Sequence, residues 1–129
     1  MTERLVLIVD VDADHREIIR LVVEEIVGAA TAQAADGEAA LRRVSELKPA
    51  LVILDVWLPK LDGLEVARQL KSNAATCTIP IIWVTADVRQ QKQALRLGAA
   101  GFIEKPFDID EVADTVQLCL EQVALRETA

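Results

Sequence analysis

The stretch Leu51-Val52-Ile53-Leu54-Asp55 decides the fold of this chain. Four consecutive apolar side chains precede a carboxylate, without the polar–apolar alternation of a strand that has one face in water. A continuous apolar run of this length is typical of a strand that helices cover on both faces. The runs Leu5–Val9 and Ile79–Val84 have the same character. We therefore predict three buried strands of a parallel sheet.

Working outward from these strands, the chain alternates short apolar runs with helical patterns. Ala30–Ala34 and Gly101–Ile103 are weaker runs, which we predict to be strands of small residues or edge strands. The predicted helices cover about 14–27, 37–47, 64–72 and 88–97, and a fifth runs from after Pro106 to about 121. Strands that alternate with helices form a parallel sheet with helices on both faces. The predicted class is α/β.

The helical patterns also predict which side chains face the sheet. In the first helix we expect Ile18, Leu21, Val22, Ile26 and their neighbours to face inward, and Arg16, Glu17, Arg20, Glu24 and Glu25 to face water. In the last helix the expected inward stripe is Ile109, Val112, Val116, Cys119 and Val123. Asp36 and Asp108 are placed to cap the second and fifth helices.

Length and composition limit the possible functions. A chain of 129 residues fits one domain, and a net charge of −7 argues against a broad basic face for nucleic acid. The sequence has no apolar run near the roughly 20 residues of a membrane span and no pattern of a signal peptide. Cys77 and Cys119 lie far apart without metal-ligand spacing, so we expect two reduced thiols. These features predict a cytoplasmic location.

Polar side chains follow four of the predicted strands. Asp10 and Asp12 follow the first strand, Asp55 the third, Thr85 the fourth and Lys105 the fifth. The carboxyl ends of parallel strands share one sheet edge, where ligands bind in open α/β folds. A carboxylate can attack phosphorus, a magnesium ion and a lysine can neutralise phosphoryl oxygens, and a hydroxyl can bond another oxygen. The set therefore suits phosphoryl transfer to Asp55.

These residues stand in a recognisable order. The sequence resembles the receiver domain of two-component response regulators over essentially its whole length, from Leu5 to about Val123. The resemblance lies in Leu7-Ile8-Val9-Asp10, Leu51 to Pro59, Asp62-Gly63, Val84-Thr85-Ala86 and Lys105-Pro106-Phe107. It implies a flavodoxin-like (βα)5 fold, doubly wound, with a five-stranded parallel sheet in the order 2-1-3-4-5. We expect residues 1–129 to form a single receiver domain, with no output domain in this chain.

The resemblance also implies roles for individual residues. Asp55 is implied as the phosphoacceptor, and Thr85, Lys105 and Phe102 as the residues that bind phosphate or switch. Mg²⁺ is implied between Asp10, Asp55 and the backbone carbonyl of Trp57, with a cis bond between Lys105 and Pro106. A phosphoacceptor switch is not an enzyme beyond its own phosphotransfer and dephosphorylation. The implied partners are a histidine kinase or a phosphotransfer protein.

One position departs from the family. Receivers carry two adjacent acidic residues after the first strand, and here Val11 stands at the second, which is usually a direct metal ligand. Valine cannot coordinate a cation, so we expect weaker magnesium binding and slower phosphotransfer. Asp12 is a further candidate ligand, although it is acidic in many receivers and is therefore not an obvious substitute.

Two other functions stay open at this point. A receiver without a working metal site could act as a binding module, independent of phosphorylation, through the helix 4, strand 5 and helix 5 face used for dimers and output proteins. Alternatively, Asp10-Val11-Asp12 looks like the Asp-x-Asp start of haloacid-dehalogenase-type phosphatases, with Asp10 as nucleophile. The chain is short for that fold and lacks its later acidic pair.

Structural roles also compete at four positions. Thr85 could bond its own loop, and Phe102 could simply pack in its strand. His15 is expected to be a solvated surface residue, and Trp83 a core residue of the fourth strand.

Overall fold

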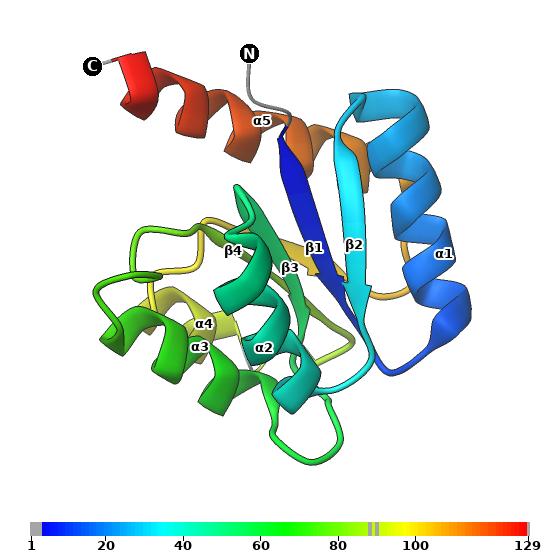
Figure 1. Ribbon diagram of the computed structural model, residues 1–129. Coiled ribbons are helices and arrows are strands. Elements are labelled where there is room, and N and C mark those ends of the chain that lie inside the picture. The colour runs from blue at the N-terminus through cyan, green and yellow to red at the C-terminus, as the bar shows by residue number, and fades with distance from the viewer. Residues whose placement is uncertain (1–3, 88, 90, 129) are drawn as a thin grey trace.

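A computed structural model describes residues 4–87, 89 and 91–128. It shows a five-stranded parallel sheet in the order β2-β1-β3-β4-β5, as the resemblance implies (Figure 1). The strands are β1 (Leu5–Val9), β2 (Ala30–Ala34), β3 (Leu51–Asp55), β4 (Ile81–Thr85) and β5 (Gly101–Glu104). The helices are α1 (Ala13–Leu21), the π-helical η1 (Val22–Val27), α2 (Gly37–Leu47), α3 (Gly63–Ser72), α4 (Gln91–Arg96) and α5 (Ile109–Thr128).

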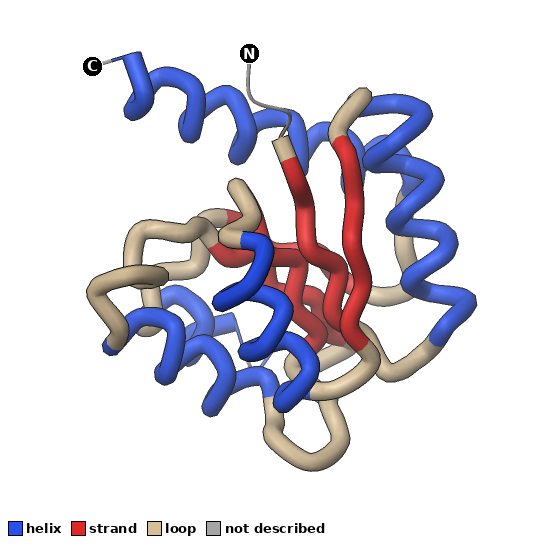
Figure 2. The backbone as a smooth tube through the Cα atoms, in the orientation of Figure 1, coloured by secondary structure: helices blue, strands red, loops and turns tan. Residues whose placement is uncertain are grey.

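Helices cover both faces of the sheet, so its central strands are buried on both sides (Figure 2). On one face α1, η1 and α5 pack against Val6, Ile8 and Ile53, while on the other α2, α3 and α4 pack against Leu7 and Leu54. Trp83 is buried in the second layer, as predicted. This two-sided burial explains the continuous apolar runs of β1, β3 and β4.

Several predicted boundaries are confirmed. Helix α2 spans the predicted residues, and the carboxylate of Asp36 accepts a hydrogen bond from the N–H of Ala39 at its start. Asp108 accepts hydrogen bonds from two N–H groups in the first turn of α5. Strand β4 begins at Ile81, two residues later than predicted, since Pro80 has no N–H for the ladder. The predicted start of the fourth helix at Val88 lies outside the described residues.

The predicted inward face of the first helix is wrong at three positions. Ile18, Leu21 and Ile26 are exposed, whereas Ile19, Val22 and Val23 are buried against the sheet. Adjacent positions of this helix are both apolar, for example Ile18 and Ile19. The apolar pattern therefore fits either of two inward faces, which differ by a shift of one residue along the sequence. The loosely wound η1, which ends at the left-handed Gly28, belongs to the same stretch. Ile109 of α5 is also exposed, while Val112, Val116 and Cys119 are buried as predicted.

The sheet register places the carboxyl ends of the central strands side by side. Asp55 at the end of β3 lies opposite Val84, and Thr85 at the end of β4 lies opposite Glu104. Asp10 and Lys105 directly follow β1 and β5. In the described part of the chain, no helix has the length and apolar character needed to cross a bilayer.

Candidate functional site

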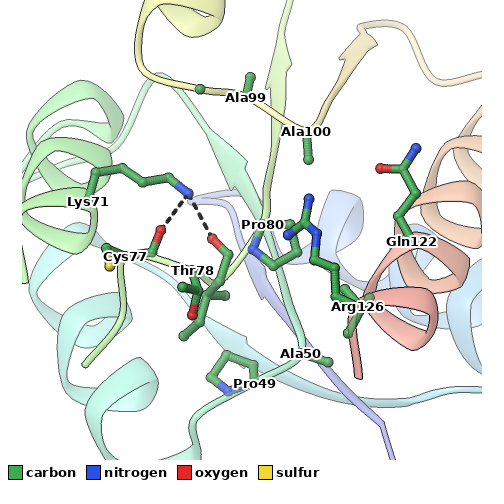
Figure 3. A pocket seen from close by; sticks show the side chains of 13 residues that line it. Pro49, Ala50, Lys71, Cys77, Thr78, Pro80, Ala99, Ala100, Gln122 and Arg126 are labelled. Atoms are coloured by element: carbon green, nitrogen blue, oxygen red, sulfur yellow. Dashed lines mark hydrogen bonds between the residues drawn. The ribbon is translucent and has the colours of Figure 1, made fainter. Parts of the chain in front are cut away.

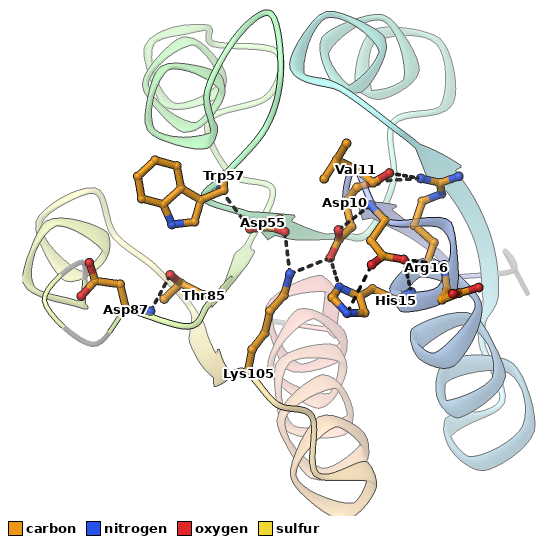
Figure 4. Close-up of polar contacts among 11 residues, drawn as sticks. Asp10, Val11, His15, Arg16, Asp55, Trp57, Thr85, Asp87 and Lys105 are labelled. Carbon is orange, nitrogen blue, oxygen red and sulfur yellow. Dashed lines mark hydrogen bonds and ion pairs between the residues drawn. The ribbon is translucent and has the colours of Figure 1, made fainter.

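Three of the side chains expected at the site meet at the carboxyl edge of the sheet (Figure 4). The Lys105 ammonium lies 2.8 Å from Oδ2 of Asp55 and 3.2 Å from Oδ2 of Asp10. Both aspartates are almost fully buried, with exposed fractions of 2% and 1%. Two buried carboxylates thus share one lysine, which leaves an excess negative charge at the edge.

Burial and pairing act in opposite directions on these groups. Burial raises the pKa of Asp55, and the nearby Asp10 adds to this rise, although hydrogen bonds from Lys105 and from the Trp57 N–H oppose it. Burial alone would lower the pKa of Lys105, but its contacts with Asp55 and Asp10 outweigh burial and raise it. Lys105 is therefore positively charged at neutral pH. The ionised form of the neighbouring Asp55 is destabilised by burial, and a further cation beside it would stabilise that form.

The backbone around Asp55 is tightly constrained. The N–H of Trp57 donates to Oδ1 of Asp55 at 2.9 Å, which orients the carboxylate. Gly63 begins α3 directly against this strand end, where an added Cβ would lie 2.5 Å from the carbonyl oxygen of Asp55. The Lys105–Pro106 bond is cis, as the resemblance implies. Trp57 is 64% exposed beside the site.

Thr85 hydrogen-bonds its own loop and Phe102 packs against the core, which are the structural roles that the sequence allows for them. Thr85 is fully buried, and its hydroxyl accepts a hydrogen bond from the N–H of Asp87 at 3.0 Å. Phe102 is half-buried and packs against the core on the α4 side of the sheet. Their roles in switching stay predictions.

The β1–α1 loop shows what replaces the second acidic residue. The Val11 side chain is 54% exposed and offers no ligand atom. Asp12 caps α1, since its carboxylate accepts hydrogen bonds from the N–H groups of Asp14 and His15. The bond from Asp14 is the main reason that the pKa of Asp12 is lowered. The Asp12 carboxylate is thus already engaged by the helix, although its role as a ligand stays a prediction.

His15 lies at the site, so the expectation that it is a solvated surface residue is wrong. Its Nδ1 lies 3.5 Å from Oδ2 of Asp10, and its Nε2 lies 3.6 Å from Oδ2 of Asp12. Its ring also packs edge-on against Phe107, with 5.2 Å between ring centroids. The available signal was its position in the first turn of α1, three residues after the cap and therefore directed to the same sheet edge.

Arg16 holds the same loop from its outer side. Its guanidinium donates to the carbonyl oxygens of Asp10 at 2.8 Å and Val11 at 3.3 Å, and to the Gln33 side chain at 2.9 Å. The prediction that Arg16 faces water is therefore wrong, because the loop carbonyls at the end of β1 need a donor.

The oxygen atoms at this edge suit magnesium, with fewer donors than a full receiver site. Oδ2 of Asp10 is buried and, despite its ionic contacts, accepts no well-directed hydrogen bond. Mg²⁺ is often held by one or two carboxylates together with water and phosphate oxygens. Among the described residues, no group of three His, Cys, Asp or Glu is arranged to hold a metal. The carboxylates of Asp10 and Asp55 and the neighbouring backbone are the oxygen atoms available here, and their role as metal ligands stays a prediction.

Comparison with known proteins agrees with this geometry. The family model "Response regulator receiver domain" matches residues 6–117. The phosphate regulon transcriptional regulatory protein PhoB of Pseudomonas aeruginosa is 35% identical over 95% of this chain and 54% of its own length. The DNA-binding dual master transcriptional regulator RpaA of Synechocystis is 31% identical over 91% of this chain and 49% of its own length.

The chain therefore spans about half the length of these curated relatives. Because one of them is named as DNA-binding, the relatives give no support to the expectation that nucleic acid is excluded as a partner.

Solved structures show the same fold. The receiver domain of NtrX from Brucella abortus is 31% identical, with a TM-score of 0.82 over 90% of this chain and 98% of that one. The chemotaxis response regulator CheY4 of Vibrio cholerae is 26% identical, with a TM-score of 0.83 over 92% of this chain and 99% of that one. Together with the family match and the site at the strand ends, these likenesses show that the chain belongs to the response regulator receiver domain family.

Proposed function

We propose that this domain is a phosphoacceptor switch of a two-component pathway, in which Asp55 receives a phosphoryl group from a histidine kinase or a phosphotransfer protein. The observation that carries the proposal is the position of Lys105, which bridges Asp55 and Asp10 at the carboxyl edge of the sheet. The domain acts by changing state, with no turnover of a separate substrate. We propose the cytoplasm as its compartment, where its two free cysteines stay reduced.

The residues divide the work of phosphoryl transfer. An Asp55 carboxylate oxygen attacks phosphorus, and the bond from phosphorus to the donor nitrogen breaks as the new acyl phosphate forms. Lys105 moves its contact from the carboxylate to a phosphoryl oxygen. Asp10, Asp55 and the carbonyl of Trp57 would hold Mg²⁺, which would supply positive charge to neutralise the phosphoryl group. Thr85 turns its hydroxyl toward another phosphoryl oxygen, which releases the N–H of Asp87 and changes the loop after β4.

The face formed by α4, β5 and α5 is our candidate for the output surface. It lies next to the loop that Thr85 controls, so a change in that loop reaches it directly. Exposed charges on α4 and α5 offer rim contacts to a second copy or to an output protein: Lys92, Arg96, Asp110, Glu111 and Asp114. We propose a phosphorylation-dependent partner, or a homodimer, on this face.

Beryllofluoride, an analogue of a phosphoryl group, tests the proposal in the presence of Mg²⁺. We expect NMR signals of Thr85, Phe102 and Lys105 to shift, and the shifts to disappear in an Asp55→Asn variant, which has no carboxylate to hold the analogue. A Val11→Asp variant serves as the positive control for an intact metal site. If neither the natural chain nor Val11→Asp responds, the proposed phosphoacceptor is wrong.

Val11 favours a second candidate, a metal-impaired receiver that acts as a phosphorylation-independent binding module. Lys105 lies 3.2 Å and His15 3.5 Å from Oδ2 of Asp10, so side chains of the domain itself already contact this carboxylate. In this case the Asp55→Asn variant binds its partner normally, and only Val11→Asp responds to beryllofluoride. Loss of partner binding in Asp55→Asn would exclude the binding-module function.

A further inference from the structure

A second pocket opens at the opposite end of the sheet from Asp55 (Figure 3). It has a volume of about 690 Å³, within the usual range for ligand-binding pockets. Its walls come from the segments that precede β3, β4 and β5, from α3 and from the last turns of α5. The proposed phosphoacceptor function makes no use of this pocket.

Two cations enter this pocket from facing walls. Lys71 of α3 donates to the carbonyl oxygens of Cys77 at 3.3 Å and Ile79 at 3.0 Å, which fixes its ammonium at the wall. Arg126 reaches in from α5 on the other side (Figure 3). Burial lowers the pKa of Lys71, and the positive charge of Arg126 lowers it further, so the two cations are close enough to repel one another.

Among the side chains that the structure describes, the pocket is lined by no anionic group. None of its lining residues is an aspartate or glutamate, and no ion pair given by the described residues involves Lys71 or Arg126. By contrast, Arg20 and Arg68 pair with glutamates on their own helices. The chain as a whole has a net charge of −7, so a pocket lined by two cations stands out from the rest of the molecule. The positive potential of such a pocket favours the binding of an anion.

The remaining surface of the pocket defines what kind of anion fits. An ammonium has three donors, and two of those on Lys71 are used, so one remains. The planar donor fork of Arg126 and the amide of Gln122 line the same pocket from the α5 side. Pro49, Pro80 and Val123 provide an apolar wall. Such a set suits a compact molecule with one strongly charged group and a small apolar part.

We infer that this pocket binds a small organic anion, with a phosphate or carboxylate group held between Arg126 and Lys71. The two possible groups share the same chemistry of recognition, two or more oxygens that accept hydrogen bonds from a guanidinium and an ammonium. Both β4 and β5 run from this pocket to the site at Thr85 and Lys105. A ligand here would therefore contact the same strands as the phosphoacceptor site, from their other end.

The test is an NMR titration of the whole chain with pyrophosphate and, separately, with citrate, in EDTA so that no metal directs either anion to Asp55. We expect saturable shifts at Ala99, Ala100 and the Arg126 side chain with at least one probe. The probe that binds more tightly identifies phosphate or carboxylate as the preferred group. An Arg126→Gln variant should bind about tenfold more weakly or worse, because it loses charged hydrogen bonds.

Arg43→Gln is the matched control, since it removes the same charge from the exposed face of α2 and should leave binding unchanged. Arg126 is itself exposed near the end of α5, so its replacement leaves the fold intact, and the NMR spectrum verifies this. The inference is overturned if neither probe saturates. It is equally overturned if Arg126→Gln binds as well as the natural chain, or if the shifts appear at Asp10 and Asp55 instead.

Discussion

Replacing Lys105 with methionine is the sharpest perturbation of the site, because Lys105 is the cation that Asp10 and Asp55 share. Methionine keeps most of the aliphatic side chain but removes the ammonium, which lies 2.8 Å and 3.2 Å from the two carboxylates. Removing one partner of a buried ion pair costs roughly 3–5 kcal/mol. The two carboxylates would then face one another at nearly zero solvent exposure.

The loss in the free energy of unfolding has an upper limit, because one of the two carboxyl groups can stay protonated in the folded variant. Holding a proton at pH 7 on an aspartate whose ordinary pKa is 3.8 costs about 4.4 kcal/mol, at 1.36 kcal/mol per pH unit. We therefore expect Lys105→Met to lower the free energy of unfolding by about 3 kcal/mol at pH 7. The folded variant binds more protons than the unfolded chain above pH 3.8, so its stability falls as the pH rises.

Urea denaturation, followed by the fluorescence of the buried Trp83, measures this effect at pH 5, 6 and 7. The stability difference from the natural chain should shrink by about 2 kcal/mol between pH 7 and pH 5. Lys92→Met, at an exposed position on α4, is the control and should cost almost nothing at any pH. If Lys105→Met is as stable as the natural chain at pH 7, or if its loss of stability does not change with pH, Lys105 is not the cation that the two carboxylates share.

Two further predictions concern the metal and the backbone. Val11→Asp should tighten Mg²⁺ binding by about tenfold or more, because it adds a carboxylate to the donor set, and a Mg²⁺ titration followed by Trp57 fluorescence measures this. Equal affinity in both forms would show that position 11 does not limit the site. Gly37→Ala should lower the free energy of unfolding by about 2 kcal/mol or more, since its Cβ would lie 2.1 Å from the carbonyl oxygen of Leu61. Gly28→Ala, with a φ of +86° but open space, should cost only about 1 kcal/mol, and the reverse order in urea denaturation would contradict this packing.

The sheet was predictable because its strands carry a strong and simple signal. Leu51 to Leu54 are continuously apolar since they are buried on both faces, and polar residues at the ends of four of the five strands mark the carboxyl edge. The helix ends were also readable from local chemistry, as the cap of Asp36 on α2 shows. These features depend on neighbours in sequence, which is why the sequence alone reveals them.

The inward face of the first helix was not predictable, because both Ile18 and Ile19 are apolar and the sequence cannot weigh one against the other. The contacts of His15 depend on Asp10 and Phe107, which come from two other segments of the chain. The sharing of Lys105 between Asp10 and Asp55 likewise requires the strand order and the register. Packing in three dimensions decides these features, and only the structure shows it.

The most direct test of the phosphoacceptor is to locate the phosphoryl group after incubation with acetyl phosphate and Mg²⁺. Borohydride reduction marks the modified aspartate, and peptide mass mapping then identifies it in the natural chain and in Val11→Asp. The account predicts modification at Asp55 in both, to a greater extent in Val11→Asp. Modification of Asp10 instead, as a haloacid-dehalogenase-type nucleophile would show, or of neither residue in either form, would contradict it.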